Sequence, residues 1–410
     1  MTTVRVNRKA ADRALSGHPW LFSSDVIDRG NAQPGEAVRV VIDRRGSEGQ
    51  LLGTAHFSST SQITLRMLSN RSEPIDRAFF LARLQHAIAH RDRVVEDSEA
   101  CRLVFSEADL LPGLIIDRYG PHLVLQTLTQ GMDRAKDVIV DCLNELLSPQ
   151  GILARNDATV RKLEDLPREV STLSGTIPDR AEIRMNGLTL HADLLRGQKT
   201  GVYLDQRENY QAAARWARHI YRTSAHGTDG KPTRILDCFS STGGFALHVA
   251  PFAETVETIE SSESAIAAAE ENARANNIAN IQFRQADVFD FLSGASPNPG
   301  STKGSGRYSM IILDPPAFAK SRRAVEGAAR GYKDINFRAL RLLEPGGVLV
   351  TCSCSHHMSE ADLLAAVAEA ALDAGKTLRV LERRTQASDH PILLTVPETL
   401  YLKCLILQVI

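Results

Sequence analysis

The stretch that decides the fold is Arg234–Ala250, which reads R-I-L-D-C-F-S-S-T-G-G-F-A-L-H-V-A. A short apolar strand ends in the acid Asp237, a turn of small residues follows at Ser240–Gly244, and a helix begins near Phe245. Adjacent glycines let the backbone approach a ligand closely, and the first turn of the helix directs N–H groups toward it. Because the spacing G-x-G-x-x-G is missing, this turn favours a nucleotide-type cofactor other than a dinucleotide, with an ordinary βα turn as the alternative.

The composition is that of a globular protein with more than one domain. A length of 410 residues predicts two or three domains, and 43% hydrophobic with 24% charged residues is typical of globular proteins. The sequence has no apolar run of membrane-spanning length and no apolar signal core near its start, so we expect a cytoplasmic protein without a membrane partner. The six cysteines have neither C-x-x-C nor histidine spacing, which predicts no disulfide framework and no metal site.

Residues 1–70 resemble a small β-rich unit with a basic start. Over these residues nine Lys and Arg face six Asp and Glu, and Arg5, Arg8, Lys9 and Arg13 precede the aromatic stretch Gly17–Phe22. Cations beside aromatic rings suit single-stranded nucleic acid, but a solvated edge with Trp20 and Phe22 in the core is an equally good interpretation. A net charge of −1 argues only against a polycationic protein. The strand-like runs are Ala37–Asp43, Leu51–Phe57 and Gln62–Leu68.

The next segment, up to about residue 193, predicts a middle α+β domain. Its apolar periodicity indicates helices at Pro74–Asp97 and Arg134–Leu147. Strands are expected at Leu114–Asp117 and His122–Thr127, and a hairpin at Ile183–Asp193 around Asn186-Gly187.

From about residue 195 strands and helices alternate, which predicts an open parallel sheet that binds ligands at the carboxyl ends of its strands. The expected strands are Ile235–Cys238, Thr255–Glu260, Ile281–Arg284, Met310–Leu313 and Val348–Cys352. The expected helices are Glu208–Tyr221, Ser264–Asn276 and Asp334–Leu343. Two polar segments, Thr223–Thr233 and Ser293–Gly306, are expected to be a surface loop and a mobile insert.

An acid stands at or just after the carboxyl end of each of the first four strands: Asp237, Glu260, Asp287 and Asp314. Each alone would be an ordinary helix cap or surface group, but four in order indicate a ligand site along one sheet edge. Glu260 follows Asp237 by 23 residues, near the spacing at which an acid meets ribose hydroxyls in nucleotide-binding folds.

Two further features carry chemistry. The stretch Asp314-Pro315-Pro316-Ala317-Phe318 fixes the backbone after the acid and offers a ring for stacking, a turn typical of enzymes that place a base or amide against a methyl donor. The fifth strand runs into Thr351-Cys352-Ser353-Cys354-Ser355. Two cysteines two residues apart share a face if the strand continues, so periodicity leaves both open; the later position of Cys354 favours it.

At this point the sequence resembles a known family, the class I S-adenosylmethionine-dependent methyltransferases of the ribosomal RNA large subunit methyltransferase I type, which modify cytosine. The resemblance covers nearly the whole chain. Departures are His356-His357 and the two polar insertions. The matching motifs are Gly17–Phe22, Leu111–Tyr119, Gly201–Arg207, the Arg234–Ala250 loop, Leu313–Phe318, Ser353–Ser355 and Asp389-His390-Pro391.

The resemblance implies the domains and the roles of individual residues. It implies a PUA-like RNA-binding domain at 1–72, a middle α+β domain at 73–193 and a Rossmann-like methyltransferase domain at 194–410. Cys354 would be the nucleophile and Asp314 its catalytic partner. The implied cofactor residues are Asp205, Gln206, Arg207, Asp237, Phe239, Ser240, Thr242, Gly243, Gly244, Glu260, Asp287 and Asp314, and the implied substrate residues are Pro315, Pro316, Phe318 and Lys320.

The reaction expected from this resemblance is formation of 5-methylcytosine in large-subunit ribosomal RNA through a covalent bond between Cys354 and C6 of the base. The rival interpretations are a guanine N-methyltransferase, which needs no cysteine, and a non-catalytic RNA-binding assembly factor. A small-molecule methyltransferase would have little use for residues 1–70. A homodimer is compatible with the sequence.

Overall fold

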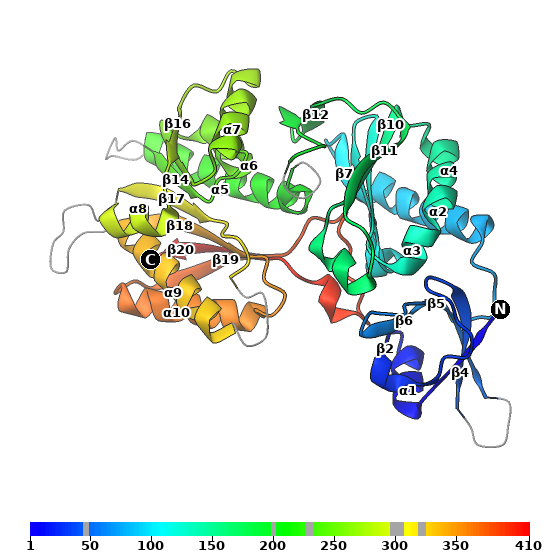
Figure 1. The fold of residues 1–410 in the computed structure, drawn as a ribbon. Coiled ribbons are helices and arrows are strands. Elements are labelled where there is room, and N and C mark those ends of the chain that lie inside the picture. Colours follow the sequence, from blue (N-terminus) through cyan, green and yellow to red (C-terminus); the bar gives the residue numbers. More distant parts are fainter. Residues whose placement is uncertain (44–48, 198–201, 227–232, 296–306, 319–324) are drawn as a thin grey trace. The chain divides into compact units, whose positions relative to one another are not determined.

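The chain folds into two compact units. The computed structural model describes residues 1–43, 49–197, 202–226, 233–295, 307–318 and 325–410 (Figure 1). Unit 1 contains Met1–Gly187, Ala192–Leu204 and Ser388–Thr399, and unit 2 contains Leu188–His191, Asp205–Ala387 and Leu400–Ile410. The chain therefore passes between the units repeatedly, and the predicted boundaries at residues 72 and 193 stay predictions. Among the described residues, no helix combines the length and apolar character of a membrane span.

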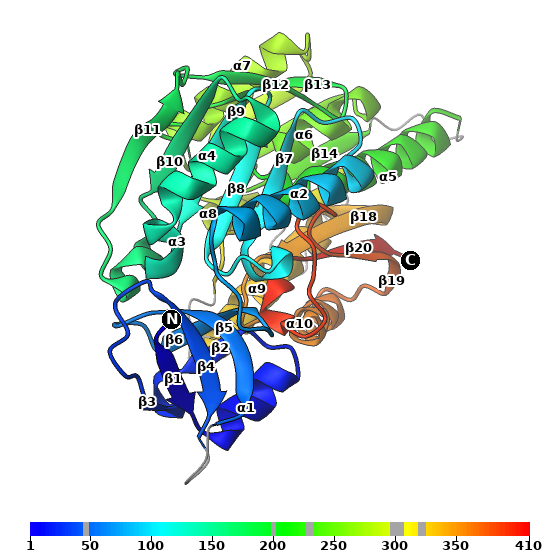
Figure 2. The same cartoon turned by 90° about the vertical axis from the view of Figure 1, so that its right-hand side faces the viewer.

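The N-terminal part of unit 1 is a β-sheet with the strand order β2-β6-β5-β4-β1-β3. Alternating buried valines and leucines from β1, β4 and β6 form its core with helix α1, whose N-cap Asn7 accepts a hydrogen bond from the Ala10 N–H. The sheet is visible in Figure 2. The elements are β1 (Thr3–Val6), α1 (Arg8–Leu15), β2 (Trp20–Phe22), β3 (Val26–Asp28), β4 (Ala37–Ile42), β5 (Leu51–Phe57) and β6 (Ile63–Ser69).

The middle part of unit 1 is a sheet of order β11-β10-β9-β8-β7, in which β9 and β10 are parallel and the other neighbours are antiparallel. Helices α2 and α4 pack together over an apolar core that includes Phe80, Leu84 and Leu143. The elements are α2 (Arg77–Val94), β7 (Ala100–Phe105), β8 (Leu114–Tyr119), β9 (His122–Thr127), α3 (Gln130–Arg134), α4 (Lys136–Leu147), β10 (Gly151–Asn156), β11 (Glu169–Gly175) and β12 (Ala181–Met185). The next strand, β13 (Leu188–Ala192), belongs to unit 2 up to His191.

Unit 2 is built on a sheet of order β16-β15-β14-β17-β18-β20-β19. The first five of these strands are parallel, whereas β20 runs antiparallel to β18 and β19 antiparallel to β20. The strands are β14 (Arg234–Cys238), β15 (Thr255–Glu260), β16 (Ile281–Gln285), β17 (Tyr308–Leu313), β18 (Leu343–Ser353), β19 (Leu378–Arg384) and β20 (Lys403–Val409).

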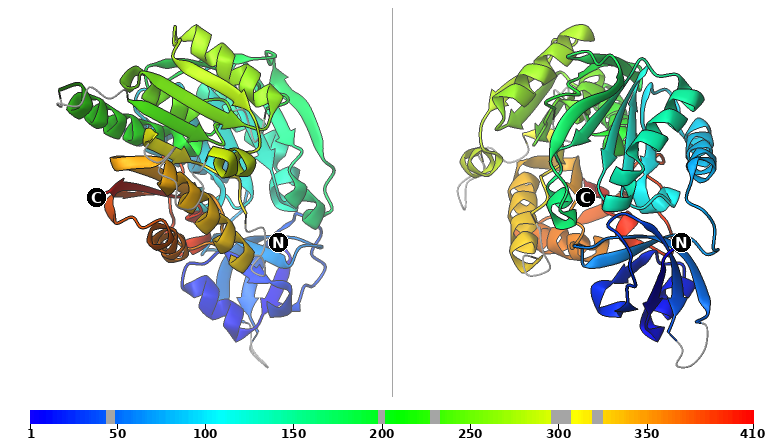
Figure 3. Two further views of the ribbon diagram at one scale, coloured as in Figure 1. Left: turned by 90° about the vertical axis from the view of Figure 1, so that its left-hand side faces the viewer. Right: turned by 45° about the vertical axis from the view of Figure 1, so that its right-hand side comes forward.

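Helices cover both faces of this sheet, as the views in Figure 3 show. On one face α8, α9 and α10 share an apolar core with the strands, and on the other face lie α5, α6 and α7. The helices are α5 (Arg207–His226), α6 (Gly244–Val249), α7 (Glu263–Ala275), α8 (Val288–Ala295), α9 (Val325–Leu342) and α10 (Glu360–Asp373). A doubly covered, mainly parallel sheet confirms the predicted Rossmann-like architecture.

Several predicted elements differ from the structure. The helix expected at Arg134–Leu147 is divided at Ala135 into α3 and α4. Helix α5 continues to His226, four residues into the segment predicted as a loop from Thr223. Helix α9 begins nine residues before Asp334. The predicted sheet was parallel, whereas β20 and β19 add two antiparallel pairs. The sequence pattern contained no signal for these two strands. Most of the two predicted loops, residues 227–232 and 296–306, lies outside the described residues.

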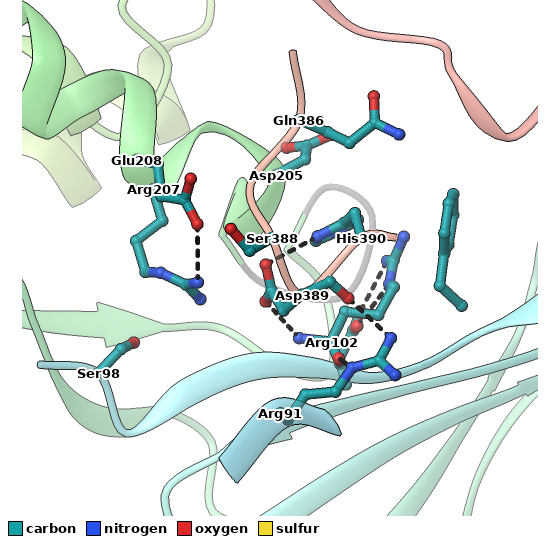
Figure 4. A network of polar contacts seen from close by, with 12 residues as sticks. Arg91, Ser98, Arg102, Asp205, Arg207, Glu208, Gln386, Ser388, Asp389 and His390 are labelled. Atoms are coloured by element: carbon teal, nitrogen blue, oxygen red, sulfur yellow. Dashed lines mark hydrogen bonds and ion pairs between the residues drawn. The ribbon is translucent and has the colours of Figure 1, made fainter. Parts of the chain in front are cut away.

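The connection between β19 and β20 leaves unit 2 and belongs to unit 1 from Ser388 to Thr399. Asp389, which is fully buried, anchors it there: its Oδ2 accepts the Arg102 N–H at 2.8 Å, and its carbonyl accepts from the Arg91 guanidinium at 2.8 Å (Figure 4). The His390 ring lies 3.1 Å from the other carboxylate oxygen, Oδ1. These buried, charge-assisted bonds give the Asp389-His390-Pro391 motif a structural role in unit 1.

Candidate active site at the carboxyl edge of the unit 2 sheet

Asp237 occupies the centre of this edge, near the end of β14. Its side chain is fully buried, and Oδ2 accepts the Ala246 N–H of helix α6 at 3.0 Å. The other oxygen, Oδ1, is buried with no hydrogen-bond partner among the residues that the structure describes. Burial first, and then the nearby carboxyl of Asp314, raises the pKa of Asp237 well above its ordinary value. A buried acceptor of this kind is costly to leave without a partner, which indicates a ligand with a donor group.

The turn after β14 is held in a strained backbone conformation. Phe239 and Ser241 have φ angles of 62° and 47°, which residues with a Cβ seldom adopt. Glu260 supports the turn, since one of its carboxylate oxygens accepts the Ser241 N–H at 3.0 Å. Its other oxygen accepts the N–H groups of Ser261 and Ser262 at 2.8 and 2.9 Å. The carboxylate of Glu260 is therefore fixed at the end of β15.

The two glycines of the turn have different reasons to be glycine. Gly243 has a φ of 85° in the left-handed region. A Cβ on Gly244 would come within 2.4 Å of Cζ of Tyr210 in α5. Tyr210 in turn packs edge-on against Phe245 and stacks on His248, with ring centroids 4.7 and 5.1 Å away. The second glycine thus permits helix packing, and the expectation that it serves close approach of a ligand has a competing structural explanation.

The Asp314 turn follows β17 directly, on the same edge as Asp237. The Asp314 N–H lies 3.4 Å from the Cys238 carbonyl, which continues the β14–β17 pairing past the strand ends. Pro315 is buried and Pro316 is exposed. The Phe318 ring lies 4.8 Å from Tyr332 and 5.9 Å from Phe289.

Phe289 in turn lies 6.3 Å from Phe239, so a row of aromatic rings extends from the turn after β14 to the Asp314 turn. Lys320, which we expected to bind substrate, lies outside the described residues.

The structure separates the two cysteines that periodicity left open. Strand β18 ends at Ser353, so Cys352 stays inside the ladder, opposite Cys404 on β20 and fully buried. A hydrogen bond to Cys404 and burial raise the pKa of the Cys352 thiol well above its ordinary value. Cys354 lies beyond the strand end and is half-buried. Next to it, the Ser355 hydroxyl lies 3.3 Å from the Tyr332 hydroxyl. Accessibility therefore favours Cys354 as a nucleophile.

The predicted cofactor residues Asp205, Gln206 and Arg207 are all buried, at the start of α5. The Tyr401 hydroxyl donates to Asp205 Oδ2 at 2.7 Å, and the Asn209 amide donates to Gln206 Oε1 at 2.7 Å. These bonds fix the beginning of α5 within unit 2.

The other predicted cofactor residues spread along the edge. Ser240 is nearly buried, and Thr242 accepts through its carbonyl from Asn272 of α7 at 3.3 Å. Asp287 is exposed after β16, with its carboxylate accepting the Asp290 N–H at 3.1 Å.

Lys403, at the start of β20, is a residue that the sequence reasoning missed. It is only 4% exposed and pairs with Ser353 of β18 in the ladder. Its ammonium donates to the carbonyls of Ser355 at 2.7 Å and Tyr401 at 3.0 Å. A lysine that opens the apolar run Cys404–Leu407 is a weak sequence signal, because such a residue is usually a solvated strand end.

In unit 1 the basic cluster of the N-terminus is partly neutralised. The Arg13 guanidinium pairs with Asp25 at 2.6 Å and lies over the Phe22 ring, whereas Arg8 and Lys9 are exposed. Trp20 is half-buried, and its indole N–H donates to Glu107 at 2.8 Å. The aromatic residues are thus neither fully in the core nor fully exposed.

Comparison with known proteins agrees with this geometry. Residues 4–70 match a PUA-like domain, and residues 161–407 match the S-adenosylmethionine-dependent methyltransferase family. Two solved structures share the fold over the full chain: a protein from Streptococcus mutans described as a SAM-dependent methyltransferase (TM-score 0.79, 20% identity), and a protein described as a methyltransferase and complexed with SAH (TM-score 0.80, 21% identity).

Two curated relatives carry the name ribosomal RNA large subunit methyltransferase I. The one from Tolumonas auensis is 39% identical over 419 aligned residues, covering 100% of both chains. The one from Aeromonas salmonicida is 39% identical and covers 96% of both chains. The chain therefore belongs to the S-adenosylmethionine-dependent methyltransferases, in the family of ribosomal RNA large subunit methyltransferase I.

Proposed function

We propose that the protein forms 5-methylcytosine in large-subunit ribosomal RNA through a transient covalent bond between Cys354 and C6 of the target cytosine. The observation that carries the proposal is the position of Cys354 just beyond β18, half-buried and on the same sheet edge as Asp314. The parallel register supports this placement, because Leu313 of β17 pairs with Thr351 of β18. The names of the full-length relatives support ribosomal RNA as the substrate.

The residues at the edge fit S-adenosylmethionine, which supplies a methyl group made electrophilic by its sulfonium. The buried Oδ1 of Asp237 has no partner within the described part of the chain, so it can accept from a donor group of the cofactor. Glu260, 23 residues later, is held at the end of β15 where ribose hydroxyls are expected. Asp205, Gln206 and Arg207 would lie near the methionine end, Asp287 near the adenine, and Phe239 to Gly244 would form the turn between them.

Carbon C5 of cytosine is a poor nucleophile, and addition of a cysteine thiolate at C6 makes C5 more nucleophilic. Addition of the Cys354 thiolate forms the S–C6 bond and pushes electron density to C5, which then takes the methyl group. A base removes the proton from C5, and the returning electron pair breaks the S–C6 bond and restores the aromatic ring. Asp314 would bind the N3 and N4 edge of the base and stabilise the charge that develops during addition.

The target base must leave its stack to reach this edge, because C6 is not accessible in stacked RNA. Pro315, Pro316 and Phe318 are proposed to border the base, and Lys320 to contact it. The PUA-like domain at residues 4–70 is proposed to hold flanking RNA, with the exposed Arg8 and Lys9 available for phosphates.

The test is covalent trapping with ribosomal RNA fragments that contain 5-fluorocytosine. Fluorine at C5 cannot leave as the proton does, so the S–C6 bond should persist and give a protein–RNA band that survives denaturation. Wild type and the Cys352→Ala control should form this band, and Cys354→Ser should not. Methylation of unmodified RNA by Cys354→Ser at the wild-type rate would contradict the proposal. A methylated guanine with no trapped band would indicate the guanine N-methyltransferase instead.

A further inference from the structure

The contacts of Lys403 fix its ammonium beside the proposed nucleophile. The ammonium donates to the carbonyl of Ser355, the residue directly after Cys354, at 2.7 Å. Its second bond goes to the Tyr401 carbonyl at 3.0 Å, and the Tyr401 hydroxyl is itself held by Asp205 at 2.7 Å. The base of the side chain is fixed by the β18–β20 ladder, in which Lys403 pairs with Ser353. A flexible side chain is thus restrained at both ends.

These hydrogen bonds do not neutralise the buried charge. Both acceptors are backbone carbonyls, and the residue is 4% exposed. Burial lowers the pKa of Lys403 to about 8, against the favourable charges of Cys354 first and Asp362 of α10 second. A buried ammonium is costly unless an anion compensates for the lost water. Asp362 lies at an exposed helix start with its carboxylate already bound by Ser359, so Cys354 is the better placed of the two.

The acidic groups around the thiol oppose a negative charge there, whereas the exposed His356, whose ring lies 5.6 Å from the Tyr401 ring, is a second basic group near Cys354. Tyr332 of α9 lies against Ser355, and burial together with the charges of Cys354 and Asp314 raises its pKa. Asp314, directly after β17, is an acid, and the pKa of the buried Cys352 thiol is raised by its hydrogen bond to Cys404 and by burial. Lys403 is the buried lysine whose ammonium the structure holds next to this segment, through its bond to the Ser355 carbonyl.

We propose that Lys403 is a positioning residue that holds Cys354 in the thiolate form needed for attack. The inference rests on the proposed covalent mechanism and adds to it the group that activates the nucleophile. The proton that leaves Sγ passes to solvent, and the positive charge of the Lys403 ammonium compensates for the negative charge that remains on the thiolate. When the S–C6 bond forms, the negative charge moves into the base. When that bond breaks, the thiolate returns to its place beside the ammonium.

The test is the pH dependence of Cys354 alkylation by iodoacetamide in the purified full-length protein, read by peptide mass spectrometry. Only the thiolate reacts, so the midpoint of the rate profile reports the thiol directly. The wild-type midpoint should lie below the value of about 8.5 for an ordinary cysteine. In Lys403→Gln, which keeps a donor for the carbonyls but loses the charge, the midpoint should rise by about 1 to 2 pH units.

Two variants serve as controls. Lys403→Arg keeps the charge and should keep the low midpoint. Lys376→Gln removes another partly buried lysine of unit 2, one that donates to the Leu343 carbonyl at 3.5 Å, and should leave the profile unchanged. The buried cysteines Cys352 and Cys404 should stay unmodified in each variant, and their alkylation would reveal unfolding. If Lys403→Gln unfolds, Lys403→Met, of similar volume, is read in the same way.

A wild-type midpoint at or above the ordinary value, or an unchanged midpoint in folded Lys403→Gln, would overturn the role of Lys403. The readout needs no RNA and no methyl transfer, so it is independent of the trapping experiment. If wild type is trapped covalently but Lys403→Gln has the same alkylation profile as wild type, the proposed role of Lys403 is refuted and the covalent mechanism is not. Absence of trapping would refute the covalent mechanism, whatever the alkylation profile.

Discussion

The parallel and antiparallel halves of the unit 2 sheet deliver functional side chains in opposite ways. In the parallel half, β14, β15 and β17 carry Asp237, Glu260 and Asp314 at or after their carboxyl ends. In the antiparallel half β20 runs the other way, so its first residue, Lys403, arrives at the same edge. These side chains therefore share one edge of the sheet, and strand direction decides whether the last or the first residue of a strand lies at that edge.

The largest effect that would sharpen this comparison is expected from Asp314→Asn. The substitution keeps the size of the side chain and removes the carboxylate proposed to bind the base. We expect the rate of methyl transfer to ribosomal RNA to fall by about 100-fold or more, while binding of S-adenosylmethionine in calorimetry changes little. A variant with an unimpaired transfer rate would show that the parallel half provides only the cofactor site.

Next in size is the destabilisation expected from Gly244→Ala. The added methyl would lie 2.4 Å from Cζ of Tyr210, so helix α5 or α6 must shift. We expect unfolding to be easier by about 1 to 3 kcal/mol in urea titrations. The double variant Gly244→Ala with Tyr210→Leu should recover part of this loss, since the clash partner is smaller. If the single variant is as stable as wild type but binds cofactor poorly, the glycine serves the ligand instead of packing.

A smaller effect is expected from Asp237→Asn, which retains an oxygen to accept the Ala246 N–H. The pKa of Asp237 is raised by burial and by Asp314, so the folded protein binds its proton more tightly than the unfolded chain does. The wild type therefore loses stability as the pH rises from about 4, the ordinary value of the acid, toward the raised one.

Without cofactor, Asp237→Asn should melt a few degrees higher than wild type, with a difference that grows over this pH range. It should also bind S-adenosylmethionine about tenfold more weakly, which corresponds to roughly 1.4 kcal/mol. Melting curves between pH 4 and 8 and calorimetry measure both. Equal melting temperatures at every pH would contradict a buried carboxyl with a raised pKa.

The sequence predicted the parallel half well and the antiparallel half poorly. Each parallel strand is a short apolar run followed by a turn and a helix, and that pattern is local. Residues 388–399, which belong to unit 1, separate β19 from β20 in the sequence, so no local sequence pattern predicts that the two strands pair. Lys403 could not be connected with Cys354 for the same reason, because their proximity depends on the β18–β20 register.

The choice between Cys352 and Cys354 shows a second limit of sequence reasoning. Alternation along a strand treats the two cysteines as equivalent, and only the position where β18 ends distinguishes them. The four acids were easier to predict, since each follows a recognisable strand. Gly244 was predicted as part of the turn, but the partner that requires its small size, Tyr210, lies 34 residues earlier on another helix.

The Asp389 anchor has a consequence for how the protein is made. The Arg102 N–H and the Asp389 carboxylate that accepts from it are 287 residues apart, so unit 1 cannot complete its buried polar contacts until nearly the whole chain has left the ribosome. The bond from the Arg91 guanidinium to the Asp389 carbonyl likewise cannot form before Asp389 has been synthesised. Folding of the N-terminal half during synthesis should therefore stop at an incomplete state, and release of the C-terminal residues should finish both units together.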